Sequence, residues 1–211
     1  MTDASSPCGL PVGTPVLTPT GQVAVEDLAP GALVLAVSGT SAPFQPVVAV
    51  RRLHWTGPMV RLRTEALDDG APQETLLLPP GQALLIDGVL VDAGELVDGH
   101  GILPVAADGP VELVQVTLAG HDAVLAGGVA VESARPHPDA PECAPRRPPD
   151  AALRALLSWR AEQMGWAAPH AASPAPLVGS LRDRLAASPF APAIRPALPG
   201  GDPGEPEIGI D

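Results

Sequence analysis

The sequence predicts an all-β domain followed by a short helical extension and a disordered tail. Between Pro15 and Val131, short β-branched and leucine-rich runs alternate with Gly, Pro and Asp, which is typical of a sandwich or barrel. Asp-Gly pairs between the runs provide turn residues. Hydrophobic residues make up 45% of the chain but aromatic residues only 2%, and tyrosine is missing. We therefore expect a core of valine, leucine and alanine.

The expected strands are short and are separated by turn residues. The first two form a hairpin over residues 16–23, with the turn at Pro19-Thr20-Gly21. The clearest of the others span residues 32–37, 47–55, 59–64, 75–78, 82–86, 111–118 and 122–126. No helical period competes with them in this part of the chain.

The strongest hairpin signal is Asp87-Gly88, which lies between two aliphatic triplets. A two-residue loop of this kind needs positive φ, which Asp and Gly tolerate. The same reasoning predicts turns at Asp69-Gly70 and Asp98-Gly99.

The character of the chain changes after Ser133. Residues 134–149 are dense in proline, so we expect an extended linker that cannot join a sheet ladder. Residues 150–187 carry two leucine stripes at helical spacing, the first opened by an N-cap aspartate, Asp150. Residues 188–211 form an acidic, Pro/Gly-rich tail that predicts disorder. The three tryptophans, Trp55, Trp159 and Trp166, are expected to anchor packing.

Charge and composition exclude several functions. The formal net charge of -12 repels nucleic-acid and membrane phosphates, so we expect neither partner. No apolar stretch suggests a signal peptide or a membrane span, which favours a cytoplasmic protein or one exported by a non-Sec route. No histidine stands at a spacing typical of metal ligands, and no cofactor motif occurs. Two cysteines could form one bridge but do not amount to a disulfide framework.

Three blocks of the sequence carry a family resemblance. The first is CGLPVGTPVLTPTGQVAVEDLAPG, which starts at Cys8. The second is the segment from Gly57 to Ile102, with an ALxxG turn, and the third is VELVQVTLAGHDAVLAGGVAVES, which ends at Ser133. In this order and spacing they resemble bacterial Hint (hedgehog/intein) self-processing domains. The resemblance implies a Hint-like β fold over residues 8–133, preceded by a leader of residues 1–7.

The same resemblance implies a nucleophile at Cys8. In the family, the thiolate of this cysteine attacks the preceding peptide carbonyl and converts an amide into a thioester. A histidine in the middle block then protonates the leaving amide nitrogen. Here Gln82 stands at that position, and no histidine lies between Leu76 and Leu96. Glutamine forms hydrogen bonds but cannot transfer a proton near neutral pH.

The closing block keeps His121, at the position of the family's second histidine. Asp122 follows it, but neighbours on a strand point to opposite faces, so we expect no pairing between them. Intein versions end in His-Asn, where the asparagine cyclises; this chain has Glu132-Ser133 there and contains no asparagine. Splicing through asparagine cyclisation is therefore excluded.

The resemblance thus implies a degenerate self-processing domain that does not splice and whose autoproteolysis is impaired. If any chemistry survives, Cys8 is the nucleophile and His121 assists. The alternative is a non-catalytic β scaffold that contacts a protein partner through its C-terminal helices. Both readings also allow Cys8 and His121 to be ordinary packing residues.

Overall fold

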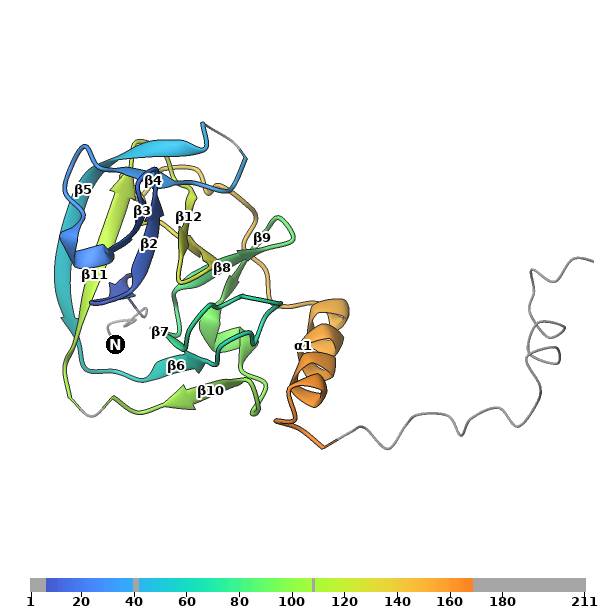
Figure 1. The fold of residues 1–211 in the computed structure, drawn as a ribbon. Helices are drawn as coiled ribbons and strands as arrows, with labels where there is room; N and C mark the ends of the chain where they lie inside the picture. Colours follow the sequence, from blue (N-terminus) through green and yellow to red (C-terminus); the bar gives the residue numbers. More distant parts are fainter. Residues whose placement is uncertain (1–6, 40–41, 108, 169–211) are drawn as a thin grey trace, which may run out of the picture. The chain divides into compact units, whose positions relative to one another are not determined.

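The computed structural model describes residues 7–39, 42–107 and 109–168 (Figure 1). Thirteen strands and one α-helix occur in these ranges. The strands are β1 Leu10–Pro11, β2 Pro15–Thr18, β3 Gly21–Ala24, β4 Leu33–Leu35, β5 Phe44–Trp55, β6 Met59–Leu62, β7 Leu76–Leu78, β8 Ala83–Ile86, β9 Val89–Asp92, β10 Ile102–Val105, β11 Val111–Leu118, β12 Ala123–Ala126 and β13 Val129–Glu132; the helix is α1 Ala151–Gln163. The predicted all-β class is confirmed.

The strands form three sheets. The orders are β1-β11-β5-β4, β10-β6-β7 and β3-β2-β12-β13-β8-β9, and every named pair of strands is antiparallel. The long strands β5 and β11 run side by side along one edge of the fold (Figure 1). This topology brings the N-terminal strand β1 onto β11, more than a hundred residues later in the chain.

The core is aliphatic, as the composition predicts. Its fully buried large side chains are leucine, isoleucine, valine and methionine, accompanied by one polar residue, Gln82. Because a buried polar group costs free energy unless it is hydrogen-bonded, Gln82 needs partners inside the fold.

Turn residues and short hydrophobic runs in the sequence predict most of the observed strands. The hairpin at Asp87-Gly88 joins β8 to β9, with Ile86 paired to Val89. Both turn residues have positive φ, 49° and 75°, as a type I′ turn requires. The strands β10 and β13 and the two-residue β1 are additional to those that the sequence predicts.

The expectation that the proline-rich segment after Ser133 cannot join a sheet ladder is wrong, because the segment bonds to the sheets. Ala134 and Arg146 each form a parallel bridge, to Thr117 and Leu90 respectively. Leu90 also accepts from the Arg147 amide at 3.0 Å. The segment therefore runs along the edge strand β9, where prolines are tolerated.

Helix α1 begins as the sequence predicts. The side chain of Asp150 caps it by accepting from the Leu153 amide at 2.8 Å. The helix buries Leu157, Arg160 and Ala161. Trp159, however, is 52% exposed, so the expectation that it anchors packing is wrong. The second leucine stripe and the acidic tail lie outside the described residues.

Neither α1 nor any other helix in the described ranges has the length and apolar character needed to cross a bilayer.

Trp166, just beyond α1, packs on the backbone of Gly101. A Cβ atom added at Gly101 would lie 2.7 Å from the indole ring, too close for any side chain.

We expect Gly101→Ala to displace the indole and to destabilise the fold by about 1–3 kcal/mol, because extra volume in a packed contact forces strain. Urea unfolding measures this loss. Gly120→Ala is the matched control, since nothing lies within 4 Å of its added Cβ; an equal effect in both variants would contradict the assignment.

Candidate functional site

Cys8 lies directly before β1, and its thiol is half-buried. The side-chain amide of Gln115, on β11, donates to the Cys8 carbonyl oxygen at 2.8 Å and to its Sγ at 3.3 Å. The pairing of β1 with β11 creates this contact, because it places Leu10 opposite Val114. The thiol is therefore held by a hydrogen-bond donor that cannot remove its proton.

Gln82 lies immediately before β8 and is completely buried. Its Oε1 accepts from the Gly9 amide at 2.6 Å, and its Nε2 donates to the carbonyl oxygen of Glu132 at 3.0 Å and to that of Ala83 at 3.3 Å. The side chain therefore joins the residue after Cys8 to the end of β13. Every polar atom of Gln82 has a partner inside the fold, as a buried amide requires.

His121 is buried and uses both ring nitrogens. Nε2 lies 2.9 Å from Oε1 of Glu132, and Nδ1 accepts from the Cys143 backbone amide at 2.9 Å. A protonated Nδ1 could not accept this amide proton. We therefore assign the neutral ring, with its proton on Nε2 and directed at Glu132.

Two influences on the His121 ring oppose each other. Burial lowers its pKa, whereas the side chains of Cys143 and Glu132 raise it, to about 9. The amide bond at Nδ1 works against this rise, because protonation would break it. Protonation of the ring, which the raised pKa favours at neutral pH, therefore requires the Cys143 backbone amide to move away from Nδ1.

The Glu132 carboxylate is the centre of a charged cluster. It accepts from His121 and from the guanidinium of Arg146, which also pairs with Asp92 and Glu142. Burial raises the pKa of Glu132, but the hydrogen bonds from His121 and Arg146 outweigh it and lower the pKa overall. The carboxylate is therefore ionised at neutral pH and is largely neutralised by its partners.

A small cavity of about 10 Å³ lies beside the thiol, lined among others by Cys8, Gln82, Gln115, Glu132 and Ser133. Such a volume holds at most about one water molecule. The cavity therefore has no room for a bound small-molecule substrate.

The structure gathers some of the predicted site residues and separates others. Cys8 and Gln82 line one cavity. His121 bonds to Glu132 and Cys143, and within the described ranges it forms no hydrogen bond with Cys8. Asp122 does not bond to His121; its carboxylate accepts from the Ser38 and Ala123 amides and from Gln45.

Sequence reasoning missed three participants, Gln115, Cys143 and Arg146. Gln115 reaches Cys8 across 107 residues, and only the pairing of β1 with β11 could have indicated it. Cys143 and Arg146 belong to the proline-rich segment, which carries no periodic pattern that would place it on the sheets.

The surroundings of Cys8 predict that its thiol reacts slowly with alkylating reagents. Burial, with the Glu132 carboxylate, raises the pKa of Cys8 above its usual value, although the hydrogen bond from Gln115 lowers it. A raised pKa leaves less thiolate at a given pH. We expect folded Cys143→Ser protein to react with iodoacetamide more slowly at neutral pH than the same protein in urea, with a rate that still climbs above pH 9.0, the ordinary pKa. Mass spectrometry of the labelled chain measures this, and equal rates in both states would refute it.

The chain matches a known protein family. The sequence profile of a family described as "Hint domain" matches residues 8–138. No curated protein sequence matches significantly.

Solved structures with a similar fold include inteins and intein-like domains. The bacterial intein-like domain from Clostridium thermocellum is 20% identical, with a TM-score of 0.48, and the alignment covers 61% of this chain and all of that domain. A DnaB intein from Synechocystis sp. PCC 6803 is 16% identical, with a TM-score of 0.45, over 61% of this chain and 99% of the intein.

Proposed function

This chain belongs to the Hint domain family, and we propose that it is a self-processing domain that cannot splice and whose acyl shift at Pro7–Cys8 is strongly impaired. One observation carries the proposal. Gln82 stands where the resemblance places the general acid, and its side chain is buried and fully used in hydrogen bonds.

The acyl shift needs a proton at the leaving nitrogen. The Cys8 thiol loses its proton, its sulfur bonds to the Pro7 carbonyl carbon, and the bond from that carbon to the Cys8 nitrogen breaks. The nitrogen must then gain a proton to leave as an amine. Gln82 cannot supply this proton, and the Nε2 proton of His121 is directed at Glu132. We therefore infer that the tetrahedral intermediate returns to the amide.

Residual chemistry would use Cys8 as nucleophile. His121 influences the Cys8 cavity only through Glu132, which lines it, so we assign His121 a positioning role. The C-terminal half of splicing has no asparagine to cyclise. Ser133 stands at that position, and its hydroxyl accepts from the Asp122 amide at 3.1 Å.

A reporter protein fused ahead of Met1 of the full chain tests this proposal. With hydroxylamine at neutral pH, we expect only a small released fraction, which Cys8→Ala abolishes. Efficient release from the wild-type fusion, but not from Cys8→Ala, would refute the impairment. The reporter makes the product visible, since the segment of this sequence through Pro7 has only seven residues.

A second candidate function is a non-catalytic scaffold that binds a protein partner through α1. The exposed side chains of Leu156 and Trp159, at 45% and 52%, support this reading. The two functions differ in one outcome. A scaffold releases no reporter, even when a histidine is restored at position 82, whereas an impaired self-processing domain then gains activity.

A further inference from the structure

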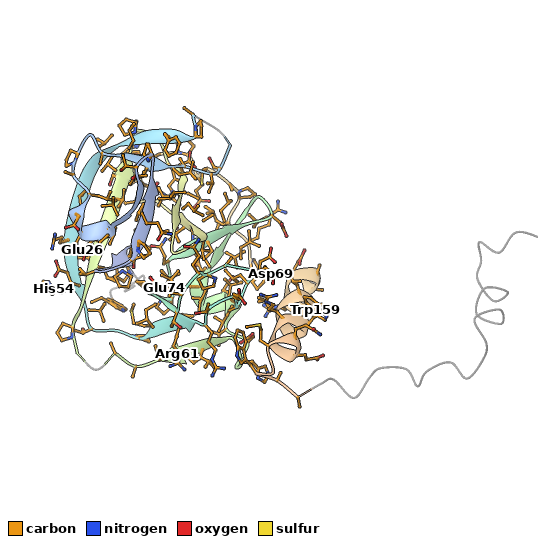
Figure 2. The ribbon with its side chains drawn as sticks, in the orientation of Figure 1. Glu26, His54, Arg61, Asp69, Glu74 and Trp159 are labelled. Atoms are coloured by element: carbon orange, nitrogen blue, oxygen red, sulfur yellow. The ribbon has the colours of Figure 1, made fainter. Side chains whose placement is uncertain are left out.

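A second pocket lies at the end of the molecule formed by β6 and β10, beside α1. Its volume is about 450 Å³, and it is lined by Arg61, Arg63, Thr64, Thr75, Met164 and Trp166. Figure 2 shows Arg61 at this end of the fold, with Trp159 on α1. None of these lining residues belongs to the Cys8 site.

Two arginines line the pocket. Arg61 lies on β6, between the buried Val60 and Leu62, and Arg63 directly follows the strand. Among the described residues, neither guanidinium forms an ion pair with a carboxylate, and the Nε of Arg61 is buried without a hydrogen-bond partner.

The aromatic wall of the pocket is held in place. The Trp166 ring lies against Gly101, and the guanidinium of Arg63 stacks over it, 5.3 Å from the ring centroid. Arg160 fastens α1 beneath it by donating to the Glu65 carbonyl at 2.8 Å and to the Asp69 carboxylate at 2.6 Å. The pocket is therefore preorganised, with a cationic side and an apolar side.

We propose that this pocket binds a small organic phosphate monoester, with the phosphate on Arg61 and Arg63 and its apolar or ring part against Met164 and Trp166. Two guanidinium groups match the double negative charge of a monoester, and each can donate a pair of hydrogen bonds to phosphate oxygens. The hydroxyls of Thr64 and Thr75 add two donors. A volume of about 450 Å³ leaves room for more than the phosphate alone. This inference is independent of the chemistry at Cys8.

The test is isothermal titration of the full chain with phenyl phosphate at low salt. We expect phenyl phosphate to bind more tightly than inorganic phosphate, and phenol to bind much more weakly. Arg61→Gln and Arg63→Gln should each weaken phenyl phosphate about tenfold or more, as expected for the loss of a charge-assisted pair. Arg51→Gln, on the exposed side of β5, is the matched control and should change nothing. Trp166→Leu should weaken phenyl phosphate more than inorganic phosphate.

Several outcomes would overturn the proposal. These are no binding heat at millimolar phenyl phosphate, equal binding by the folded Arg63→Gln variant, or equal binding of phenol. Benzoate bound as tightly as phenyl phosphate would overturn the dianion assignment. Arg63→Gln is decisive if Arg61→Gln fails to fold, because the Nε of Arg61 is buried without a partner whereas no such atom occurs in Arg63.

Discussion

Replacing Gln82 by histidine is expected to raise the rate of hydroxylamine-dependent cleavage at Pro7–Cys8 by a factor of about 10²–10⁴, the usual contribution of a general acid. The imidazole is close to glutamine in size. One ring nitrogen can accept from the Gly9 amide, as Oε1 of Gln82 does at 2.6 Å. Protonation of that nitrogen, with a ring pKa of about 6.5 before any perturbation, releases the Gly9 amide and places a transferable proton one residue from the leaving nitrogen. Quantifying the cleaved chain over time by mass spectrometry gives the rate.

Two controls distinguish acid catalysis by the new histidine from faster cleavage caused by disturbed packing at position 82. Gln82→Met keeps an unbranched side chain of similar length but has no transferable proton, so it should not accelerate cleavage. Cys8→Ala combined with Gln82→His should abolish the gain. A folded Gln82→His protein that cleaves no faster than wild type would mean that the position is not the one at which a general acid acts.

Among substitutions of buried residues in the site, removing the carboxylate of Glu132 is expected to lower the free energy of unfolding most. Glu132→Ala leaves the buried Nε2 proton of His121 without an acceptor and takes one of three carboxylates from Arg146. Breaking a buried ionic cluster from one side costs about 3 kcal/mol. Urea unfolding measures the loss, and a change below about 0.5 kcal/mol, ordinary for surface substitutions, would contradict the cluster's role.

The variant Glu132→Gln adds a pH signature to this prediction. The folded pKa of Glu132 lies below its ordinary value of 4.5. The carboxylate therefore contributes its full stability above pH 4.5, and this contribution is lost as the pH falls through the lower folded pKa. The stability gap between wild type and Glu132→Gln should thus be largest near neutral pH and should close in acid. A gap that does not change with pH would show that charge is not its cause.

The fold could largely be predicted, because its signals are local. The Asp87-Gly88 turn and the alternating β11 depend only on neighbouring residues, and both are present. The strands β1 and β10 were missed because each contains a proline and gains its stability from distant partners. Leu10 pairs with Val114, and Pro104 with Val60. Such pairing depends on the topology, so the residues of β1 and β10 carry no sequence pattern from which these strands could be predicted.

The site was predicted only in part, for the same reason. The family resemblance identified Cys8, Gln82 and His121 as positions of interest. It could not show that His121 bonds to the backbone of Cys143, because that residue lies in a proline-rich segment without period. Nor could it show that Gln115 holds the thiol, a contact that exists only because β1 adds to the edge of β11.

The intact mass of the unmodified chain tests the central claim most directly. The purified 211-residue protein is incubated with hydroxylamine at neutral pH beside Cys8→Ala, and both are followed by mass spectrometry. We predict that the full-length mass of 21.4 kDa dominates in both samples, with at most a trace of wild-type protein lacking the segment through Pro7. Complete loss of that segment from wild type, with none from Cys8→Ala, would show that the acyl shift proceeds efficiently without a histidine at position 82 and would contradict the account.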